Sequence, residues 1–473
     1  MAEDKKAVAI MHQFKTLMDQ RSNWESHWQQ LADFISPRKA DITKKRTAGD
    51  KRTDLVFDGT AIHAAEMLSA SLHGMLTNPS SAWFSLRFKD RELDGDDEAK
   101  EWLEGVIDVM YNSINRSNFA EAVHEMYSDL VVFGTGVMSI EEDEQNDLRF
   151  STRHIAECYL AEDAEGRVDT VYRKFKMTCI AMRTMFGNDN LPPRLQNMAR
   201  SEPYKEVELL HAVFPREAYD VTQLDTMNKP FASVYIDPHD KITISESGYD
   251  ELPYVCPRFL KASFERGYGR SPAMTALADT KMLNKMAEVT IRSAQKQVDP
   301  PLMLPDDGFM MPIRTVPGGL NYYRSGTRDR IEPLNIGANN QLGLNMEEQR
   351  RNAIRSAFYV DQLILSQGPQ MTATEVIQRT EEKMRLLGPV LGRLQAEMLQ
   401  PLIERCYNVL VRNKKFAPAP EFLADSGVEI EYISPLAKAQ RLGDVQSAMR
   451  LFEMLAPLSQ VNPMVFDYVD MDG

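Results

Sequence analysis

The sequence predicts an α+β protein that is mainly helical, and three observations lead to this class. Apolar residues recur at helical spacing through the N-terminal and C-terminal thirds of the chain. Short alternating runs separated by turn residues fill the region 148–264. Of the 473 residues, 43% are hydrophobic and 26% are charged, which is ordinary for a globular protein and excludes a disordered or fibrous chain. At about 150 residues per domain, this length predicts about three domains or one elongated subunit of several parts.

The N-terminal third is expected to be mostly helical. Apolar residues at helical spacing predict a first helix that ends at Ile35, because Pro37 follows it. Three further helices and one short strand are predicted in this part: 60–76, 98–115, 119–130 and Trp83–Phe88.

A basic segment follows the first helix. Residues 38–52 carry a local charge of +5, although the whole chain has a net charge of -14. A solvated loop and an arm that contacts phosphate or a partner are both consistent with this pattern. The candidate contact residues of this basic arm are Arg38, Lys39, Lys44, Lys45 and Arg46.

The middle region is expected to form a mostly antiparallel sheet. Turn signals such as Asp163–Gly166 and Asp237–Asp240 separate its short runs. A helical insert is predicted over 179–200. The predicted strands are 168–177, 206–214, 231–236 and 241–246.

The last third returns to helices, with one interruption. Ser271 is the expected N-cap of a helix over 272–297, because Pro272 suits a first helical turn. A Pro- and Gly-rich stretch, 298–340, interrupts the pattern before a second helix over 341–359. The rest is predicted as a loop over 360–371 and a long helix over 372–413, which begins with a Thr372–Glu375 capping box and is kinked at Gly388-Pro389 and Pro401.

Signatures of enzymes and of metal sites are missing from the sequence. There is no GxxxxGK[ST] phosphate loop, and Gly134-Thr135-Gly136 lacks the third glycine of a dinucleotide fingerprint, so it is interpreted as a tight turn. Asp237, His239 and Asp240 are residue types that can bind a metal, but a solvated turn explains this cluster better. We therefore expect no catalytic site, cofactor or metal.

Cysteine usage and hydropathy indicate the compartment. Four cysteines occur singly, which predicts a reducing, cytosolic setting. No apolar run reaches the length of a membrane span, so we expect a soluble protein without a membrane partner. The acidic balance argues against a protein that binds nucleic acid over its whole surface.

The layout of the last third suggests an elongated shape. Two helices on either side of a Pro- and Gly-rich excursion form a hairpin that carries a small tip. Subunits of this kind pack side by side, and head-to-tail interfaces generate rings when the rotation closes. A structural or assembly role is therefore favoured over catalysis.

Seven short motifs occur in a fixed order along the chain: Asn78–Phe84, Phe133–Gly136, Gly267–Met274, Asp299–Leu302, Met371–Val376, Leu386–Leu394 and Tyr432–Arg441. As an ordered set they resemble the head-to-tail connecting (portal) proteins of short-tailed bacteriophages. The resemblance implies a ring, usually a dodecamer, at one vertex of the capsid, through which double-stranded DNA enters and leaves.

The resemblance also implies a division of the chain and a set of partners. The expected partners are terminase, tail adaptor, capsid and scaffolding proteins, and the expected location is the virion, after assembly in the host cytoplasm. The implied parts are the wing 1–271, the stem helices 272–297 and 341–359, the clip 298–340, the tunnel loop 360–371, a long kinked wing helix 372–413 and a crown 414–473 that is short or incomplete.

Several polar residues become candidates for contact with DNA or with a partner. A uniformly basic wall would hold DNA, because each phosphate contact adds affinity through counterion release, so sparse cations suit a conduit. Lys281, Lys285 and Arg292 share one helix face, where DNA contact, solvation and salt bridges between subunits remain open. The candidates for the channel are Lys281, Lys285, Arg292, Lys296, Gln362, Ser366, Gln367 and Gln370, and those for clip docking are Arg314, Arg324, Arg328 and Arg330.

Two other functions compete with the portal interpretation. A terminase-like packaging enzyme would need the missing phosphate loop. Another capsid or adaptor protein would not need two helices around a Pro- and Gly-rich excursion. The portal interpretation therefore leads.

Overall fold

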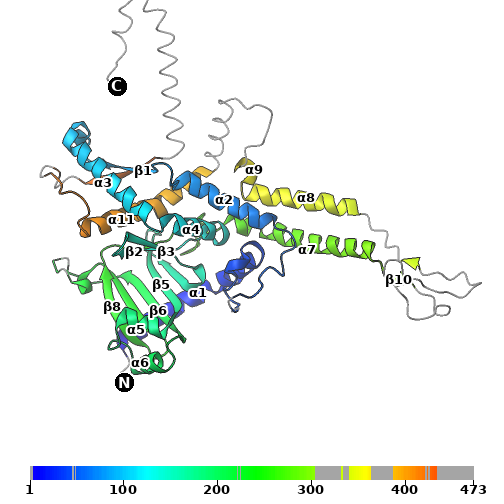
Figure 1. Cartoon of the computed structure of the whole chain (residues 1–473), viewed down its shortest axis with the longest axis horizontal. Coiled ribbons are helices and arrows are strands. Elements are labelled where there is room, and N and C mark those ends of the chain that lie inside the picture. The colour runs from blue at the N-terminus through cyan, green and yellow to red at the C-terminus, as the bar shows by residue number, and fades with distance from the viewer. Residues whose placement is uncertain are drawn as a thin grey trace, which may run out of the picture.

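The structure is a computed structural model, and it describes residues 4–44, 47, 49–220, 222–223, 225–303, 332–333, 340–363, 387–420, 423 and 427–433. A body of mixed helices and strands carries two long helices, α7 (Pro272–Val298) and α8 (Asn340–Ala357), which project from it side by side (Figure 1). We call this projecting helix pair the limb. At the far end of this limb, β10 (Leu302–Met303) pairs antiparallel with β11 (Glu332–Pro333).

The predicted N-terminal helices are present. Helix α1 (Lys5–Ile35) begins where Asp4 accepts a hydrogen bond from the Lys6 backbone N–H at 3.0 Å, and it ends two residues before Pro37. The indole of Trp28, which is buried, donates to the Phe133 carbonyl at 3.2 Å and so connects α1 to the end of helix α4 (Phe119–Phe133). The other helices of this part are α2 (Thr60–Leu76), α3 (Asp97–Arg116) and α4 (Phe119–Phe133). Helix α4 is three residues longer than predicted.

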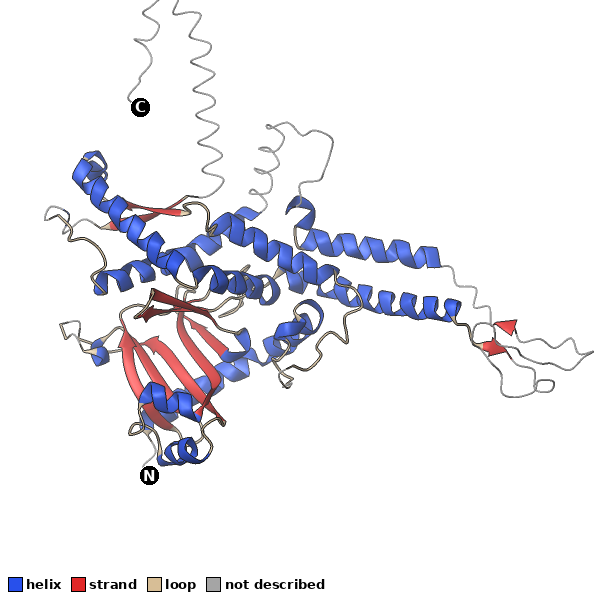
Figure 2. Ribbon diagram, viewed as in Figure 1, coloured by secondary structure: helices blue, strands red, loops and turns tan. Residues whose placement is uncertain are grey.

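A five-stranded antiparallel sheet occupies the middle region, as expected from its alternating runs (Figure 2). Within this sheet, the sequence patterns missed one strand, the edge strand β4 (Cys158–Glu162). The insert predicted over 179–200 is present as two helices, α5 (Cys179–Phe186) and α6 (Pro193–Ser201), between β5 and β6. The strands in spatial order are β4 (Cys158–Glu162), β5 (Val168–Thr178), β6 (Glu206–Pro215), β7 (Phe231–Asp237) and β8 (Ile242–Tyr249).

Two smaller sheets were not expected in full. In one of them β2 (Met138–Asp143) lies between β3 (Asp147–Thr152) and β9 (Tyr254–Val255). In the other, β1 (Phe84–Phe88) pairs antiparallel with β12 (Val428–Tyr432). The predicted strand near Trp83 therefore exists, but its partner lies at the other end of the chain.

The C-terminal helices depart from the prediction at two places. Residues 360–363 were expected in a loop but form the short helix α9 (Val360–Leu363). Tyr359, with a φ of 58°, separates α9 from α8, because a left-handed residue cannot continue a right-handed helix. The expected kink near Pro401 is a π-helical segment, Gln395–Leu399, between the helical residues 387–394 and helix α11 (Gln400–Arg412).

Proline explains why the π segment lies where it does. Pro401 has no N–H to donate, and its ring would meet the carbonyl of residue 397 in a regular α-helix. The widened turn, in which the Gln400 N–H bonds to the Gln395 carbonyl, relieves that conflict.

One large apolar core holds the body together. Its fully buried side chains include Trp28, Phe84, Tyr127 and Phe133, and it extends over α1, α2, α4, the β2 sheet and the 387–412 helical region. The base of α7 joins this core through Ala273, and the distal half of α7 leaves it. Predictions for 304–331, 334–339, 364–386 and 434–473, including the Thr372–Glu375 capping box, lie outside the described residues.

Candidate functional site

The limb begins at a well-defined helix start. Ser271 caps α7 by accepting a hydrogen bond from the Met274 N–H at 3.1 Å, with Pro272 in the first turn, as predicted. The same hydroxyl donates to the Val132 carbonyl at 2.8 Å. The start of α7 is therefore fixed to the end of α4.

Two glycines allow an unusually close approach at this point. A Cβ at Gly134 would lie 2.3 Å from the Gly269 carbonyl oxygen, and a Cβ at Gly269 would lie 2.6 Å from the Gly134 carbonyl oxygen. The Gly269 N–H donates to Thr135 Oγ1 at 2.9 Å. Gly134 also has a φ of +81°, which suits its place as the C-cap of α4. Residues 134–136 and 267–271, from two separate sequence motifs, thus form one joint at the base of α7.

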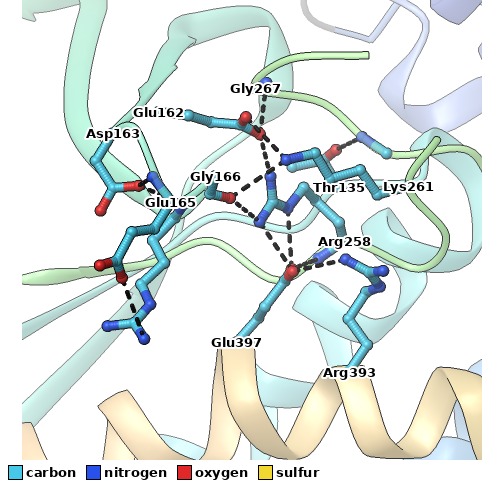
Figure 3. Close-up of polar contacts among 12 residues, drawn as sticks. Thr135, Glu162, Asp163, Glu165, Gly166, Arg258, Lys261, Gly267, Arg393 and Glu397 are labelled. Carbon is cyan, nitrogen blue, oxygen red and sulfur yellow. Dashed lines mark hydrogen bonds and ion pairs between the residues drawn. The ribbon is translucent and has the colours of Figure 1, made fainter. Parts of the chain in front are cut away.

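Behind this joint lies a buried ionic cluster centred on Arg258 (Figure 3). The Arg258 side chain is only 3% exposed. Its Nε and Nη2 donate to the Glu397 carboxylate at 2.9 and 2.8 Å, and its backbone N–H donates to the same carboxylate at 3.0 Å. Because Glu397 lies in the π-helical segment, this contact joins the long C-terminal helix to the base of the limb.

Glu162 completes the cluster from the opposite side (Figure 3). Its carboxylate pairs with Arg258 and accepts from Lys261 Nζ at 2.8 Å and from the Gly267 N–H at 2.8 Å. Arg393 adds a bond to Glu397 at 2.9 Å. Each buried charge therefore has a partner, which is the condition for tolerating charges in a protein interior.

Ion pairs also hold the two limb helices together. Arg350 of α8 pairs with Asp279 of α7 at 2.8 Å, and Thr290 Oγ1 of α7 bonds to Glu347 of α8 at 2.6 Å. Arg351 pairs with Glu347 at 3.1 Å and with Asp58 of the body at 3.0 Å. The side of α7 that carries Asp279 and Thr290 therefore faces α8.

The four cationic candidates of α7 gather on the side that faces away from α8. Lys285 and Arg292 are 71% and 68% exposed, and Lys296 is exposed as well. Glu288 lies between the first two, at 2.9 Å from Lys285 and 2.6 Å from Arg292. Lys281, nearer the body, bonds to Gln30 at 2.5 Å. We call this surface, made by Lys281, Lys285, Glu288, Arg292 and Lys296, the cationic face.

The basic arm is used partly inside the fold. Lys39 is only 20% exposed and pairs with Asp129 at 2.6 Å and with Glu125 at 2.9 Å. Burial opposes the charge on Lys39, but Asp129 and Glu125 outweigh it and raise the pKa of the amine. Lys39 therefore stabilises the α1–α4 packing and does not belong to an exposed arm, contrary to the expectation.

The other predicted contact residues lie in different surroundings. Lys44 pairs with Asp33 at 2.9 Å but stays half exposed, and Arg38 is exposed. Gln362 lies in α9, and its side chain is outside the description. The remaining candidates lie outside the described residues: Lys45, Arg46, Arg314, Arg324, Arg328, Arg330, Ser366, Gln367 and Gln370.

The polar turn at 237–240 has a structural explanation. Asp237 is fully buried and pairs with Arg194, which also bonds to Asp240 at 2.8 Å. In the part of the chain that the structure describes, no three His, Cys, Asp or Glu residues are grouped so that they could hold a metal ion. Nor does any helix among the described residues have the length and hydropathy to cross a membrane.

Sequence reasoning missed the Arg258 cluster. Its members come from three distant segments, around residues 162, 258–267 and 393–397, so no local spacing connects them. One signal was present, since Arg258 interrupts the apolar run from Tyr254 to Leu260. A charge inside a buried strand-like run needs a partner.

The comparisons with known proteins agree with the sequence motifs. A family model described as "Bacteriophage head to tail connecting protein" matches residues 7–473. The "Probable portal protein" of Bordetella phage BPP-1 and the "Portal protein" of Salmonella phage epsilon15 are each 33% identical over 484 positions, covering 100% of this chain and 86% of the relative. The "Portal protein" of Enterobacteria phage T3 is 19% identical over 94% of this chain and 82% of the relative.

Among solved structures, two chains from gene transfer agent particles resemble this one at low similarity. One is from the virion of a native particle, with a TM-score of 0.40 and 11% identity over 83% of this chain and 85% of the other. The second is from the neck of an empty particle, with a TM-score of 0.42 and 10% identity over 86% and 91%.

The family match and the named relatives define the class as connector proteins of virus particles. The chain belongs to the family of bacteriophage head to tail connecting proteins, the portal proteins.

Proposed function

We propose that copies of this chain assemble into a ring, a dodecamer, at one capsid vertex, and that double-stranded DNA passes through its channel during packaging and ejection. The observation that carries the proposal is the cationic face of α7 on a limb that projects from the body (Figure 1). Ring symmetry would turn each exposed cation into a circle of positive charge around the axis.

The cationic face suits contact with DNA that must slide. Lys285, Arg292 and Lys296 offer phosphate contacts, while Glu288 offsets part of their charge. Affinity rises with each phosphate neutralised, so a partly balanced wall would bind DNA weakly and without sequence preference. The channel wall would be α7, with α8 behind it.

The remaining parts follow the resemblance to portal proteins. In this proposal the body is the wing, α7 and α8 are the stem, and residues 298–340 are the clip where terminase and later tail adaptors dock. Residues 360–371, which begin with helix α9, would correspond to the tunnel loop. Residues from 414 would correspond to a crown toward the capsid interior, near capsid and scaffolding proteins. The ring itself would have no catalytic activity.

Particle mass and negative-stain images of the purified chain test the ring. We expect rings with an axial channel, and a monomer, or a closed shell without a channel, would overturn the proposal. An ATP hydrolysis assay on the same sample tests the terminase alternative, and we expect no turnover.

The DNA contact is tested with virions that carry the Lys285→Ala, Arg292→Ala double variant. We expect normal rings but poorer retention or slower movement of DNA, because two cations per subunit are lost. The Lys174→Ala, Lys176→Ala variant on β5 removes the same charge from strands of the body and serves as the control. Equal DNA behaviour in both variants would remove the α7 face from the proposal.

A further inference from the structure

The limb has an outer face on α7 and an outer face on α8. Between these faces it has two edges, along which both helices are accessible. The Asn284 side chain of α7 accepts hydrogen bonds from the backbone N–H groups of Phe57 and Asp58 at 2.8 and 3.2 Å, and Arg351 of α8 pairs with Asp58. The segment around residues 57–58 therefore covers one edge of the helix pair near the body. We call this side the loop edge and the opposite side the open edge.

A row of apolar side chains, which we call an apolar seam, continues the loop edge toward the tip of the limb. Ile291 and Val298 follow Asn284 at intervals of seven residues, and Leu344 precedes Arg351 by seven, so these side chains lie on the same side as the loop. Val298 is 87% exposed, and Ile291 and Leu344 are nearly half exposed.

The open edge is apolar as well. Met282 lies two residues before Asn284, a turn of about 200°, and Val289 follows Met282 by seven, which places both on the opposite side of α7. Met346, five residues before Arg351, lies on that side of α8 by the same geometry. Val289 is 56% exposed, and Met282 and Met346 are 43% and 38% exposed. Two exposed apolar seams on one projecting limb are what an interface, and not a solvated surface, requires.

Each edge also carries one accessible ion pair. Asp279, three residues before Met282, and Arg350, four residues after Met346, belong to the open edge, and their side chains are 31% and 35% exposed. Arg355 and Glu348 lie four residues after Arg351 and Leu344, which places them on the loop edge. They are 3.4 Å apart and 41% and 54% exposed.

The order of carboxylate and guanidinium from the base of the limb to its tip is opposite in the two ion pairs. Asn284 and Arg351 both contact Asp58, so they lie at about the same distance from the body. At about 1.5 Å per residue, Asp279 and Arg355 are then about 7.5 Å and 6 Å nearer the body, because α7 runs outward and α8 runs back.

Arg350 and Glu348 lie slightly farther out than Arg351 on the same scale. From base to tip, the open edge therefore reads carboxylate and then guanidinium, and the loop edge reads guanidinium and then carboxylate. The two edges are complementary in charge when limbs stand side by side and point the same way.

We propose that the open edge of each limb packs against the loop edge of a second copy of this chain, so that Met282, Val289 and Met346 meet Ile291, Val298 and Leu344. The inference rests on the proposed ring and specifies its limb contact. The contact is heterologous, because a two-fold contact between the open edges of parallel limbs would place Asp279 against Asp279. It leaves the cationic face of α7 free for DNA.

Thiol crosslinking tests which edges meet. The Val289→Cys, Ile291→Cys double variant places one thiol on each edge at nearly the same height of α7, whereas the four native cysteines are buried. A short bismaleimide is expected to convert assembled rings of the double variant into a ladder of covalent multimers. Each single variant and the unmodified chain are expected to stay monomeric on a denaturing gel.

Three outcomes would overturn the inference. Covalent dimers of either single variant would indicate a two-fold contact. Rings of the double variant that yield only monomers would show that the limb edges do not meet, while the ring itself stands. Crosslinks from virions to a protein of different mass would assign an edge to another component. Absence of any ring would instead contradict the proposed function.

Reversal of the ion pairs gives a second, independent readout. The open-edge reversal is Asp279→Arg with Arg350→Asp, and the loop-edge reversal is Arg355→Glu with Glu348→Arg. Each keeps opposite charges side by side within its own pair but brings like charges together between chains. The loop-edge reversal also removes the 3.5 Å pair between Glu348 and Arg351 within the chain, so rescue by the combined variant is what assigns its effect to the contact between chains. We expect either reversal alone to lower the fraction of chains in rings about tenfold.

The two reversals combined in one chain restore an opposite pair at every contact between chains, and we expect the rings to return. Lys174→Glu with Glu208→Lys, which reverses a pair of similar exposure on the body, is the matched control and should leave the rings unchanged. No rescue by the combined variant, or equal loss in the control, would count against the proposed contact.

Discussion

Charged residues of this chain fall into two groups that differ in surroundings. Arg258 and Arg21 are nearly fully buried, and their guanidinium groups bond to carboxylates and to backbone carbonyls, such as Arg21 to Ile155 at 2.9 Å. The cations of α7, in contrast, extend into solvent with at most one charged partner. Removing a buried cation therefore threatens the fold, whereas removing an exposed one changes only what the surface can bind.

Glycine at position 269 is predicted to be indispensable for the joint. In Gly269→Ala the new Cβ would lie 2.6 Å from the Gly134 carbonyl oxygen and 2.8 Å from the Leu260 carbonyl oxygen, and neither backbone can move cheaply. We expect a loss of about 3 kcal/mol or more in the free energy of unfolding. Gly105→Ala is the control: nothing lies within 4 Å of its Cβ in helix α3, so a gain of about 0.5–1 kcal/mol is expected. Urea unfolding measures both, and similar values would contradict the close approach.

The buried His211 is predicted to make stability depend on pH. Burial, with Arg173 and Arg153 nearby, lowers the pKa of its imidazole to about 3. The imidazole ring stacks on the Tyr235 ring, with the two ring centroids 4.0 Å apart. The unfolded chain takes up this proton near pH 6.5 and the folded chain does not, so stability is complete above that pH and falls toward pH 3.

The expected size is about 2 kcal/mol between pH 7 and pH 5 from this residue alone. It is measured as the difference between the unmodified chain and His211→Gln in urea unfolding at both pH values. Because other histidines titrate in both proteins, their contributions cancel. Parallel losses in the two proteins would show that His211 takes up its proton in the folded state.

At the scale of elements, the sequence predicted what depends on local pattern. The start of α7 at Ser271-Pro272, the end of α1 before Pro37 and the strands β5 to β8 follow from spacing and capping. The sequence could not predict that Phe84 pairs with Tyr432, or that Arg258 meets Glu397, 139 residues away, since local patterns say nothing about distant partners. Helical spacing is local, so the sequence could place Lys285 and Arg292 on one helix face, although their contact with DNA stays a prediction. It could not show that Lys39 pairs with Asp129, because that partner lies 90 residues away.

The π-helical segment is predicted to depend on Pro401. In Pro401→Ala a regular α-helix becomes available, and that change turns Glu397 by about 100° relative to Arg258. The amide of Arg258, which donates to Glu397 at 3.0 Å, is then expected to exchange its hydrogen about tenfold faster. Hydrogen exchange followed by mass spectrometry measures this, with Gln400→Ala as a neighbouring exposed control. Unchanged protection would mean that the ionic cluster alone holds the π segment.

At the scale of the whole molecule, the body and the limb have different roles in a connector protein. The body fixes the base of the limb through the glycine joint and the buried Arg258 cluster. The limb keeps its apolar edges and cationic face exposed, so the single chain is incomplete as a surface. The net charge of -14 is compatible with DNA as a partner, because only one narrow face of the chain needs to be cationic.

The balance of charge on that face leads to a prediction for DNA movement. Glu288→Gln removes the carboxylate that lies 2.9 Å from Lys285 and 2.6 Å from Arg292, so both cations of the proposed channel face lose this partner. In the proposed ring the net charge of every subunit rises by one, and each cation that binds phosphate slows a sliding duplex. We expect slower ejection of DNA from virions, and a rate that recovers more steeply with added salt than in the unmodified particle. Glu165→Gln, on the exposed turn between β4 and β5, changes the net charge equally but lies on the body. If both variants eject DNA at the unmodified rate, contact between α7 and DNA does not limit passage, and the channel wall must be assigned to another face.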